Sequence, residues 1–337
     1  DGHADADLAR PLRHRDQHDV HDAYTADDQR DEGHGQRGGA HVAGQFDVVE
    51  VDALLAHFNA QMLSFFLLPP EIEITPLAKD RVCYVGEPLA LVIADSRALA
   101  EDAVSLIEVE YEELDPVVTL ADARIGPPIH PGTSDNISAE MGDEEIDEDL
   151  AATLNGAAHL VTQKVVHQRI SQAPMECRGV VASRDGNEEL TLWITCQSPH
   201  MIARWVSLSL GLPQTAIRVI AKDVGGSFGL KNHPWKEEVS VILAALLFGR
   251  PLKWIEDRYE ALTASNQCRE AEMTLQAAFD GEGKLLASHG DYACNNGANP
   301  QGPDNNIAVH MFVWGAYKVP AYAFLTRGYY TNTAGLA

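Results

Sequence analysis

Arg218-Val-Ile-Ala-Lys-Asp-Val-Gly-Gly-Ser-Phe-Gly-Leu-Lys231 is the stretch around which the rest of this chain is organised. Its apolar part predicts a buried strand over Ala216–Ala221, a glycine-rich loop follows at Gly225–Gly229, and a helix is expected to begin near Pro234. Glycine allows the backbone to adopt positive φ and to approach a bound group closely. Free N–H groups at such a loop suit an anion. The stretch therefore predicts a cradle for an oxyanion-rich cofactor or substrate, and the alternative is a tight strand-to-helix turn without a ligand.

The loop does not match the nucleotide-binding signatures that also depend on glycine. A P-loop has a second glycine, followed by Lys and Ser or Thr, after four intervening residues. Counted from Gly225, Leu230 stands in place of that second glycine, and Asn232 follows Lys231. The loop also lacks the G-x-G-x-x-G spacing of a Rossmann dinucleotide site.

Composition excludes several classes of protein. The net charge of −25 argues against nucleic acid as a partner, because phosphates would be repelled. No apolar run reaches the roughly 18 residues that a membrane helix needs, so no membrane span is expected. The five cysteines are widely spaced without a C-x-x-C pair, which argues against an iron–sulfur or zinc site in this chain. We expect a cytoplasmic protein with reduced thiols.

Residues 1–45 do not have the pattern of a folded segment. They contain few larger apolar residues and six histidines, so they cannot bury enough surface to offset the entropy of ordering. We predict a disordered tail or a stretch translated out of frame. The abrupt change to an apolar pattern at Phe46 favours the second interpretation.

The next segment, residues 46–123, is predicted to be a small α+β domain. A helix is expected over Arg97–Ile107, and Asp95 or Ser96 can cap it by accepting a hydrogen bond from its free N–H groups. The expected elements are a strand Arg81–Tyr84, a turn Val85–Pro88, a buried strand Leu89–Ala94, a helix Arg97–Ile107 and a half-exposed strand Glu108–Glu112. Residues 124–150 are rich in proline and acidic residues and predict a connector.

A second domain is predicted over residues 151–337. Asp185-Gly186 and Asp280-Gly-Glu-Gly283 indicate hairpin turns, and Gly211 and Gly249 are expected to end helices. The expected strands are Val161–Val166, Val180–Ser183, Leu190–Thr195, Ala216–Ala221, Leu252–Glu256, Met273–Phe279, Leu285–Tyr292 and Tyr322–Tyr330.

Several of these stretches together resemble the xanthine dehydrogenase, aldehyde oxidase and aerobic carbon monoxide dehydrogenase family. The first domain resembles its a/b hammerhead domain in Asp80-Arg-Val-Cys-Tyr-Val-Gly-Glu-Pro-Leu-Ala-Leu-Val-Ile-Ala94, Ala100-Glu-Asp-Ala103 and Val109-Glu-Tyr-Glu112. The second resembles its molybdopterin-binding domain in Pro174-Met-Glu-Cys-Arg-Gly179, Gln197-Ser-Pro-His200, Asp223-Val-Gly-Gly-Ser-Phe-Gly229, Arg250-Pro-Leu-Lys-Trp-Ile-Glu-Asp-Arg258 and Tyr329-Tyr-Thr-Asn-Thr333. Each motif alone is weak, but all occur in the family's order. The expected fold is α+β, a hammerhead domain followed by the first part of a molybdopterin-binding domain.

The resemblance implies a molybdenum–molybdopterin cofactor, in its simple or cytosine dinucleotide form. Gly225, Gly226, Ser227, Phe228 and Gly229 would place backbone N–H groups near the metal's oxo ligand and the pterin. Gln197 would hydrogen-bond an oxygen ligand of the metal, and no residue of this chain would ligate the metal directly. Backbone and amide donors suit an anionic centre because they introduce no acid or base.

The resemblance also implies a reaction and partners. The family hydroxylates an aldehyde, a heteroaromatic ring or CO-type substrate with water as the oxygen source, and a glutamate acts as base. Electrons leave through 2Fe–2S clusters to FAD, which the resemblance places on a small and a medium partner subunit. A dimer of heterotrimers is implied for the full-length protein.

The chain departs from the family in three ways. Asn232 stands where xanthine-type enzymes have an acidic residue that helps to bind a purine, and Ser227 replaces a more usual glycine. The base glutamate is expected beyond Ala337, so no catalytic residue is assigned within this chain. Glu176 is predicted to be a hydrogen-bonding residue beside the loop, and Glu237 and Glu238 are predicted to be first-turn helix acids.

Three interpretations of the chain follow. We expect the N-terminal portion of a molybdenum hydroxylase large subunit, truncated at its C-terminal end. The alternatives are a non-catalytic product that binds no cofactor, and one half of a split enzyme that a second chain completes.

Overall fold

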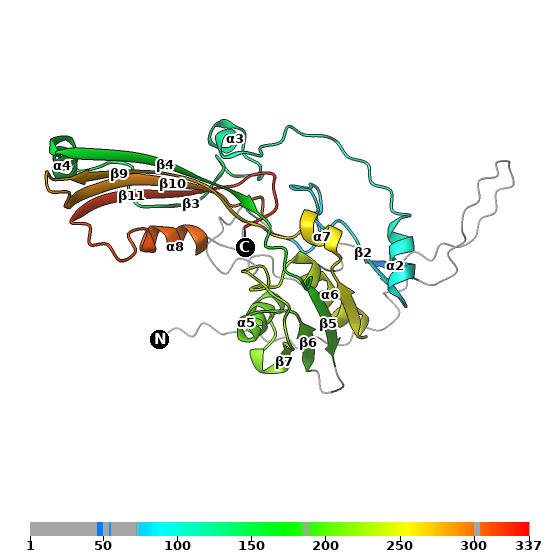
Figure 1. The fold of residues 1–337 in the computed structure, drawn as a ribbon. Coiled ribbons are helices and arrows are strands. Elements are labelled where there is room, and N and C mark those ends of the chain that lie inside the picture. The colour runs from blue at the N-terminus through cyan, green and yellow to red at the C-terminus, as the bar shows by residue number, and fades with distance from the viewer. Residues whose placement is uncertain are drawn as a thin grey trace, which may run out of the picture. The chain divides into compact units, whose positions relative to one another are not determined.

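The computed structural model describes residues 46–49, 54, 72, 74–184, 186, 189–299 and 304–336, and the predicted tail over residues 1–45 lies outside this part. Helices and β-sheets are mixed along the chain (Figure 1). Two compact units are formed: the first contains residues 46–49 and 92–110, and the second contains residues 72–91 and 111–336. None of the helices in these described ranges is long and apolar enough to cross a bilayer.

The first unit confirms the predicted helix and its cap. β1 (Phe46–Val49) pairs with β2 (Leu91–Ala94) in a two-stranded sheet. α2 (Arg97–Val104) follows, and the Ser96 hydroxyl accepts a hydrogen bond from the N–H of Leu99 (3.3 Å) at its start. This bond satisfies one of the free donors at the beginning of the helix. The helix ends at Val104 rather than at Ile107.

Two strands predicted in this part of the chain are wrong. Neither Arg81–Tyr84 nor Glu108–Glu112 is a strand in the structure. The N–H of Cys83 donates to the Glu87 carboxylate (2.6 Å), so a side chain takes the place of a partner strand. The predicted turn is confirmed, because the N–H of Glu87 donates to the Tyr84 carbonyl (3.2 Å). Alternation along 108–112 does not produce a strand because no described strand lies beside it to accept its hydrogen bonds.

The second unit contains two sheets, and the larger one has five strands. Its strands, in the order β3-β11-β10-β9-β4, are β3 (Ile137–Met141), β11 (Ala321–Tyr329), β10 (Leu285–Asn295), β9 (Cys268–Phe279) and β4 (His159–Ile170). β9 and β10 form the predicted hairpin, and the Asp280 carboxylate accepts the N–H groups of Glu282 and Lys284 (2.9 Å each) in its turn. β3 lies within the predicted connector. Residues 124–150 therefore do more than connect, since β3 pairs with β11.

Helices lie on both faces of this sheet (Figure 1). α4 (Glu148–Gly156) packs its buried leucines against alanines of β9 and β10. α3 (Leu120–Ile125) lies on the same side, whereas α8 (Asp304–Phe312) lies on the opposite side. A hollow lined by Arg124 of α3, Glu144 and Asp291 lies on this sheet.

A four-stranded sheet with two helices positions the glycine loop. Its strands, in the order β7-β6-β5-β8, are β7 (Ile217–Ile220), β6 (Leu190–Ile194), β5 (Gly179–Arg184) and β8 (Leu252–Ile255). α5 (Pro199–Leu210) and α6 (Lys236–Phe248) bury apolar side chains against it. Both helices end at the predicted glycines, which adopt left-handed φ of 64° (Gly211) and 61° (Gly249). α6 begins two residues after Pro234, later than predicted.

A buried ion cluster joins β5, β8 and α6. The Arg178 side chain, 1% exposed, donates to the Glu256 carboxylate (2.7 Å) and makes two bonds to Glu237 (3.0 and 3.1 Å). Glu238 lies 3.5 Å from the same guanidinium and accepts the N–H of Trp235 (2.7 Å). Glu237 and Glu238 do lie in the first turn of α6, as predicted. There they interact with the Arg178 guanidinium as well as with the helix dipole.

Glu238 is expected to make stability fall as pH rises. Burial raises the pKa of Glu238 to about 7, and the attraction of Arg178 does not offset it. Because this folded-state pKa lies above the unfolded value, the folded chain binds an extra proton between about pH 4.5 and pH 7 and loses stability across that window, on the order of 3 kcal/mol in total. Urea unfolding of wild type and Glu238→Gln at pH 4.5 and pH 7.5 measures this loss. The variant should gain stability relative to wild type only at the higher pH, and an equal difference at both values would contradict the expectation.

Candidate cofactor site

The glycine loop connects β7 to α6 and contains three residues with positive φ. These are Gly226 (95°), Phe228 (55°) and Gly229 (101°). Glycine has no Cβ to clash in this conformation, whereas Phe228 adopts it at a cost. Ser227 is not among the positive-φ residues, so its Cβ causes no strain of this kind. The replacement of the more usual glycine by Ser227 is therefore compatible with the loop.

Four consecutive backbone N–H groups of the loop, those of residues 226–229, donate to no acceptor within the described part of the chain. The following groups are engaged: the N–H of Leu230 donates to the Ser227 carbonyl (3.1 Å) and that of Asn232 to the Gly229 carbonyl (3.3 Å). Most backbone donors in folded proteins have a partner, and successive unpaired ones can surround an anion. The loop thus keeps a row of donors available to an anionic ligand.

Glu176 ties the first glycine of the loop to its lysine. Its carboxylate accepts the N–H of Gly225 (2.8 Å) and the ammonium of Lys231 (2.9 Å), whose side chain is 0% exposed. Burial raises the pKa of Glu176, but Lys231 and the Gly225 N–H outweigh burial and hold that pKa below its usual value. A Cβ on Gly225 would lie 2.6 Å from the Cβ of Glu176, so this contact requires glycine. The prediction that Glu176 is a hydrogen-bonding residue beside the loop is confirmed.

Gln197 is brought to the loop by its backbone, whose N–H donates to the Lys231 carbonyl (3.0 Å). Its side-chain Oε1 accepts a hydrogen bond from the Ser227 hydroxyl, which in turn accepts the N–H of Lys231 (2.9 Å). The structure therefore brings together the residues predicted to bind the cofactor, Gln197 and Gly225–Gly229. Segments 30 residues or more apart meet here, as the Ser227–Gln197 bond shows.

Two features of the site were not predicted from the sequence. The Arg258 guanidinium donates to the carbonyls of Pro174 (2.7 Å) and Met175 (3.0 Å), and so holds the segment that carries Glu176. The Ser198 hydroxyl donates to Oδ1 of Asn232 (2.7 Å). The only sequence signal for Arg258 was its place at the end of a family motif, because its acceptors are main-chain atoms.

The donors of the loop fit an oxygen-rich anionic group. They are uncharged N–H groups, and the Glu176 carboxylate, which binds the Gly225 N–H, is already paired with Lys231. None of residues 226–229 is buried, and Phe228 is 73% exposed, so the loop is accessible to a ligand. Such an arrangement can bind and orient an anion without a protonation change of its own.

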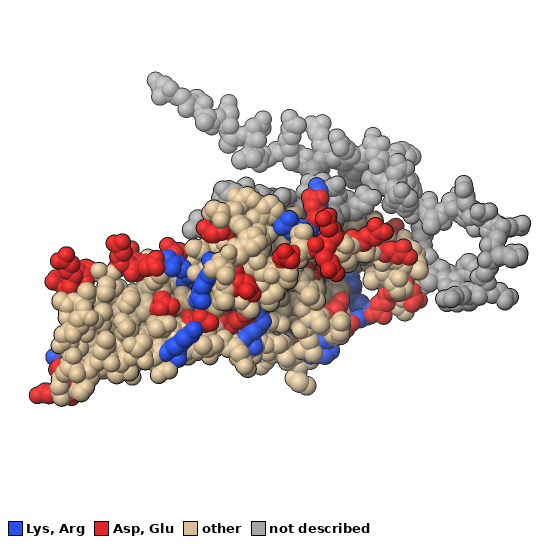
Figure 2. Space-filling view, turned by 90° about the horizontal axis from the view of Figure 1, so that it is seen from above, with Lys and Arg blue, Asp and Glu red and all other residues tan. Residues whose placement is uncertain are grey.

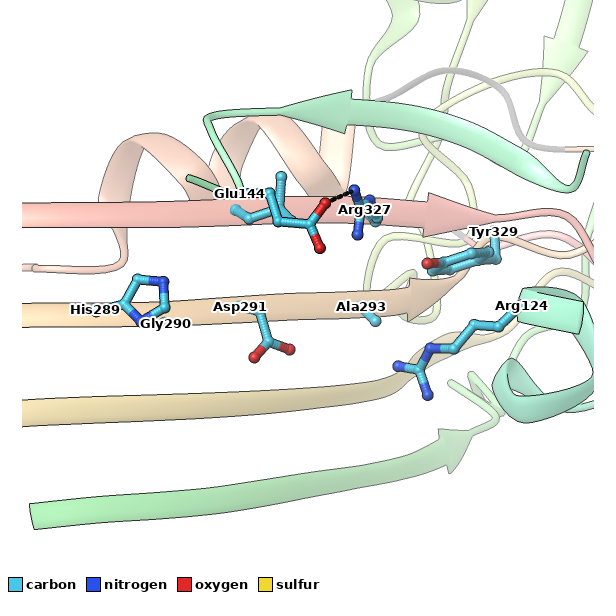
Figure 3. A pocket seen from close by; sticks show the side chains of 9 residues that line it. Arg124, Glu144, His289, Gly290, Asp291, Ala293, Arg327 and Tyr329 are labelled. Atoms are coloured by element: carbon cyan, nitrogen blue, oxygen red, sulfur yellow. Dashed lines mark hydrogen bonds and ion pairs between the residues drawn. The ribbon is translucent and has the colours of Figure 1, made fainter. Parts of the chain in front are cut away.

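Apart from the glycine loop, a hollow of about 240 Å³ on the five-stranded sheet is a candidate site. Arg124 from α3 and Asp291 and His289 of β10 line it, and Arg327 of β11 pairs with Glu144 (3.0 Å) (Figure 3). Basic and acidic side chains lie side by side on this side of the sheet (Figure 2). Both arginines have carboxylate partners, Arg124 through Glu272. The hollow therefore offers no unbalanced charge that selects a ligand, and the glycine loop is the stronger candidate.

Two stretches of the chain match models of known protein families. Residues 129–336 match the model of the molybdopterin cofactor-binding domain, and residues 45–115 match that of the aldehyde oxidase and xanthine dehydrogenase a/b hammerhead domain. The predicted α+β fold, with a hammerhead domain before a molybdopterin-binding domain, is confirmed. The predicted limits of the domains remain a prediction.

The relatives that this chain matches are much longer than the chain itself. The nicotine 6-hydroxylase large subunit of Paenarthrobacter nicotinovorans is 36% identical over 268 residues, which are 76% of this chain and 32% of that protein. The carbon monoxide dehydrogenase large chain of Hydrogenophaga pseudoflava is 32% identical over 275 residues, 77% of this chain and 34% of its own length. The structure of quinoline 2-oxidoreductase from Pseudomonas putida 86 superposes with a TM-score of 0.73 at 30% identity, covering 86% of this chain and 39% of that one. The chain thus spans about a third of the length of the relatives that it matches, and it belongs to the molybdopterin-binding family of aldehyde oxidases and xanthine dehydrogenases.

Proposed function

We propose that this chain holds a molybdenum–molybdopterin cofactor at the glycine loop, as part of the molybdenum-binding subunit of a molybdenum hydroxylase. The observation that supports this most directly is the row of four N–H groups at residues 226–229 without an acceptor in the described ranges. When bound, the cofactor supplies the redox and oxygen-transfer chemistry, and the protein supplies binding, orientation and electrostatics.

The side chains around the loop have separate tasks in this proposal. Residues 226–229 donate backbone hydrogen bonds to the anionic group. Gln197 adds the N–H groups of its amide, which neither gains nor loses a proton at ordinary pH. Glu176 and Lys231 hold the loop from behind, because their ion pair and the Gly225 N–H share one carboxylate oxygen.

The substrate class follows from the relatives and from Asn232. Relatives named for nicotine and carbon monoxide are 36% and 32% identical, and a similar structure is named for quinoline. Relatives named for xanthine or hypoxanthine are 27–29% identical. We propose a substrate of the aldehyde, heteroaromatic or CO type. A purine is disfavoured, because Asn232 has no carboxylate and its Oδ1 already accepts the Ser198 hydroxyl (2.7 Å).

The proposed complex has further subunits. Relatives are named as the large subunit or large chain of an enzyme, or as the gamma subunit of a dehydrogenase complex. A small subunit with 2Fe–2S clusters and a medium subunit with FAD would accept the electrons, in a dimer of heterotrimers located in the cytoplasm. The glutamate base of the reaction would lie outside residues 1–337.

The molybdenum and pterin content of the purified 337-residue chain tests the proposal. Wild type is expected to retain both in near-equal amounts. Gln197→Ala should weaken retention by at least about ten-fold, since one hydrogen bond to a charged group contributes about 1.5–3 kcal/mol. Ser207→Ala is the matched control, because it also removes a serine hydrogen bond, the one to the Leu212 carbonyl (2.6 Å) near the end of α5. Wild type without metal and pterin would contradict the proposal and favour a chain that binds no cofactor.

A further inference from the structure

A chain of hydrogen bonds runs from the backbone of Lys231 through the Ser227 hydroxyl to the side chain of Gln197. The N–H of Lys231 donates to Ser227 Oγ (2.9 Å), and Ser227 Oγ donates to Gln197 Oε1. The backbone of Gln197 is held separately, by the bond from its N–H to the Lys231 carbonyl (3.0 Å). Gln197 is therefore tied to the loop at its backbone and at one end of its amide.

We infer that Ser227 is a positioning residue that sets the orientation of the Gln197 amide and so turns its NH₂ group toward the ligand. This inference rests on the proposed cofactor site. It goes beyond that site because it assigns a role to the hydroxyl of Ser227, whereas the proposed function uses only the backbone N–H of this residue.

The chemistry of the hydroxyl selects one of the two amide orientations. A hydroxyl has a single hydrogen, and the backbone N–H of Lys231 occupies one of its lone pairs. The hydrogen needs an acceptor, and no atom other than Gln197 Oε1 serves as one for Ser227 among the described residues. If the amide were flipped, its NH₂ group would face Ser227 and the hydroxyl hydrogen would lose its acceptor. The observed orientation is the one in which the hydroxyl hydrogen has an acceptor among the described residues.

The orientation matters because only the NH₂ end of the amide can donate to an anion. With Oε1 bound to Ser227, Nε2 has no acceptor within the described part of the chain and remains available. It then adds two N–H donors to the row at residues 226–229. A freely rotating amide would present its oxygen to the anion part of the time, and that contact is repulsive.

The side-chain amide signal of Gln197 in ¹⁵N NMR spectra of the 337-residue chain tests the inference without cofactor. The signal is assigned by its disappearance in Gln197→Ala. In wild type it should be as rigid as the backbone in heteronuclear NOE measurements. Ser227→Ala should make it mobile, and Ser227→Thr should restore rigidity because threonine keeps the hydroxyl. Ser207→Ala, which removes a serine hydrogen bond near the end of α5, should leave the signal unchanged. An equally rigid amide in Ser227→Ala would overturn the inference.

Cofactor retention gives the second readout. Ser227→Ala is expected to retain molybdenum about two- to thirteen-fold less well than wild type, since freezing one side chain on binding costs about 0.5–1.5 kcal/mol. Ser227→Thr should retain it as wild type does. Loss of molybdenum from wild type itself would overturn the proposed function, whereas the NMR signals would still decide the role of Ser227. Equal retention by wild type and Ser227→Ala would overturn the inference alone.

Discussion

Replacing Arg178 by methionine is expected to lower the free energy of unfolding by about 3–5 kcal/mol, because breaking a buried ion pair from one side leaves uncompensated charge. The guanidinium is bonded to two carboxylates and lies beside a third. Burial raises the pKa of Glu256, but Arg178 outweighs burial and holds that pKa below its usual value, so this carboxylate depends on the arginine. Small domains are stable by only about 5–15 kcal/mol, so the loss is a large part of the total. Urea unfolding followed by circular dichroism at pH 7 measures it.

Two further variants make this result specific. Arg218→Met removes the same charge from an exposed position on β7 and should change stability by no more than about 0.5 kcal/mol. Adding Glu237→Gln and Glu256→Gln to Arg178→Met should recover part of the loss, because the buried charges are then removed together. If Arg178→Met unfolds at the same urea concentration as Arg218→Met, the cluster does not hold β5, β8 and α6 together.

Gly226→Ala is expected to weaken retention of the cofactor by at least about a hundred-fold. This is the loss in affinity if two hydrogen bonds to a charged group, of about 1.5 kcal/mol each, are broken. Gly226 has a φ of 95°, which an alanine adopts only under strain. Its Cβ would also lie 3.1 Å from the ring of Phe228. The loop is expected to relieve this strain by moving, which displaces the four N–H groups of residues 226–229. Molybdenum and pterin content of the purified variant gives the readout.

Gly211→Ala is the matched control for this experiment. Gly211 also has positive φ (64°), ends α5, and has open space where a Cβ would be added. The substitution should cost about 1–2 kcal/mol of stability through backbone strain, as at the loop, without touching the donors. Retention of molybdenum by Gly226→Ala at the wild-type level would contradict the assignment of the loop, whatever the two variants do to stability.

Local signals in the sequence predicted most of the second unit. The hairpin of β9 and β10 follows from a glycine-rich turn between two apolar runs, and the ends of α5 and α6 follow from Gly211 and Gly249. The same signals failed at Arg81–Tyr84 and Glu108–Glu112. Alternating side chains describe only one strand, whereas a strand forms only when a second one lies beside it to complete its hydrogen bonds.

The sequence by itself determined the family, the strands from β4 to β11 and the residues that gather at the glycine loop, because these depend on short motifs and on backbone preferences of neighbouring residues. Tertiary structure alone decided that β3 joins the five-stranded sheet, that Arg178 meets three glutamates, and that the Ser227 hydroxyl meets the amide of Gln197. The physical reason is the same in each case. A hydrogen bond or ion pair between segments far apart in the chain leaves no periodicity in either segment, and it exists only once the fold has brought donor and acceptor within about 3 Å.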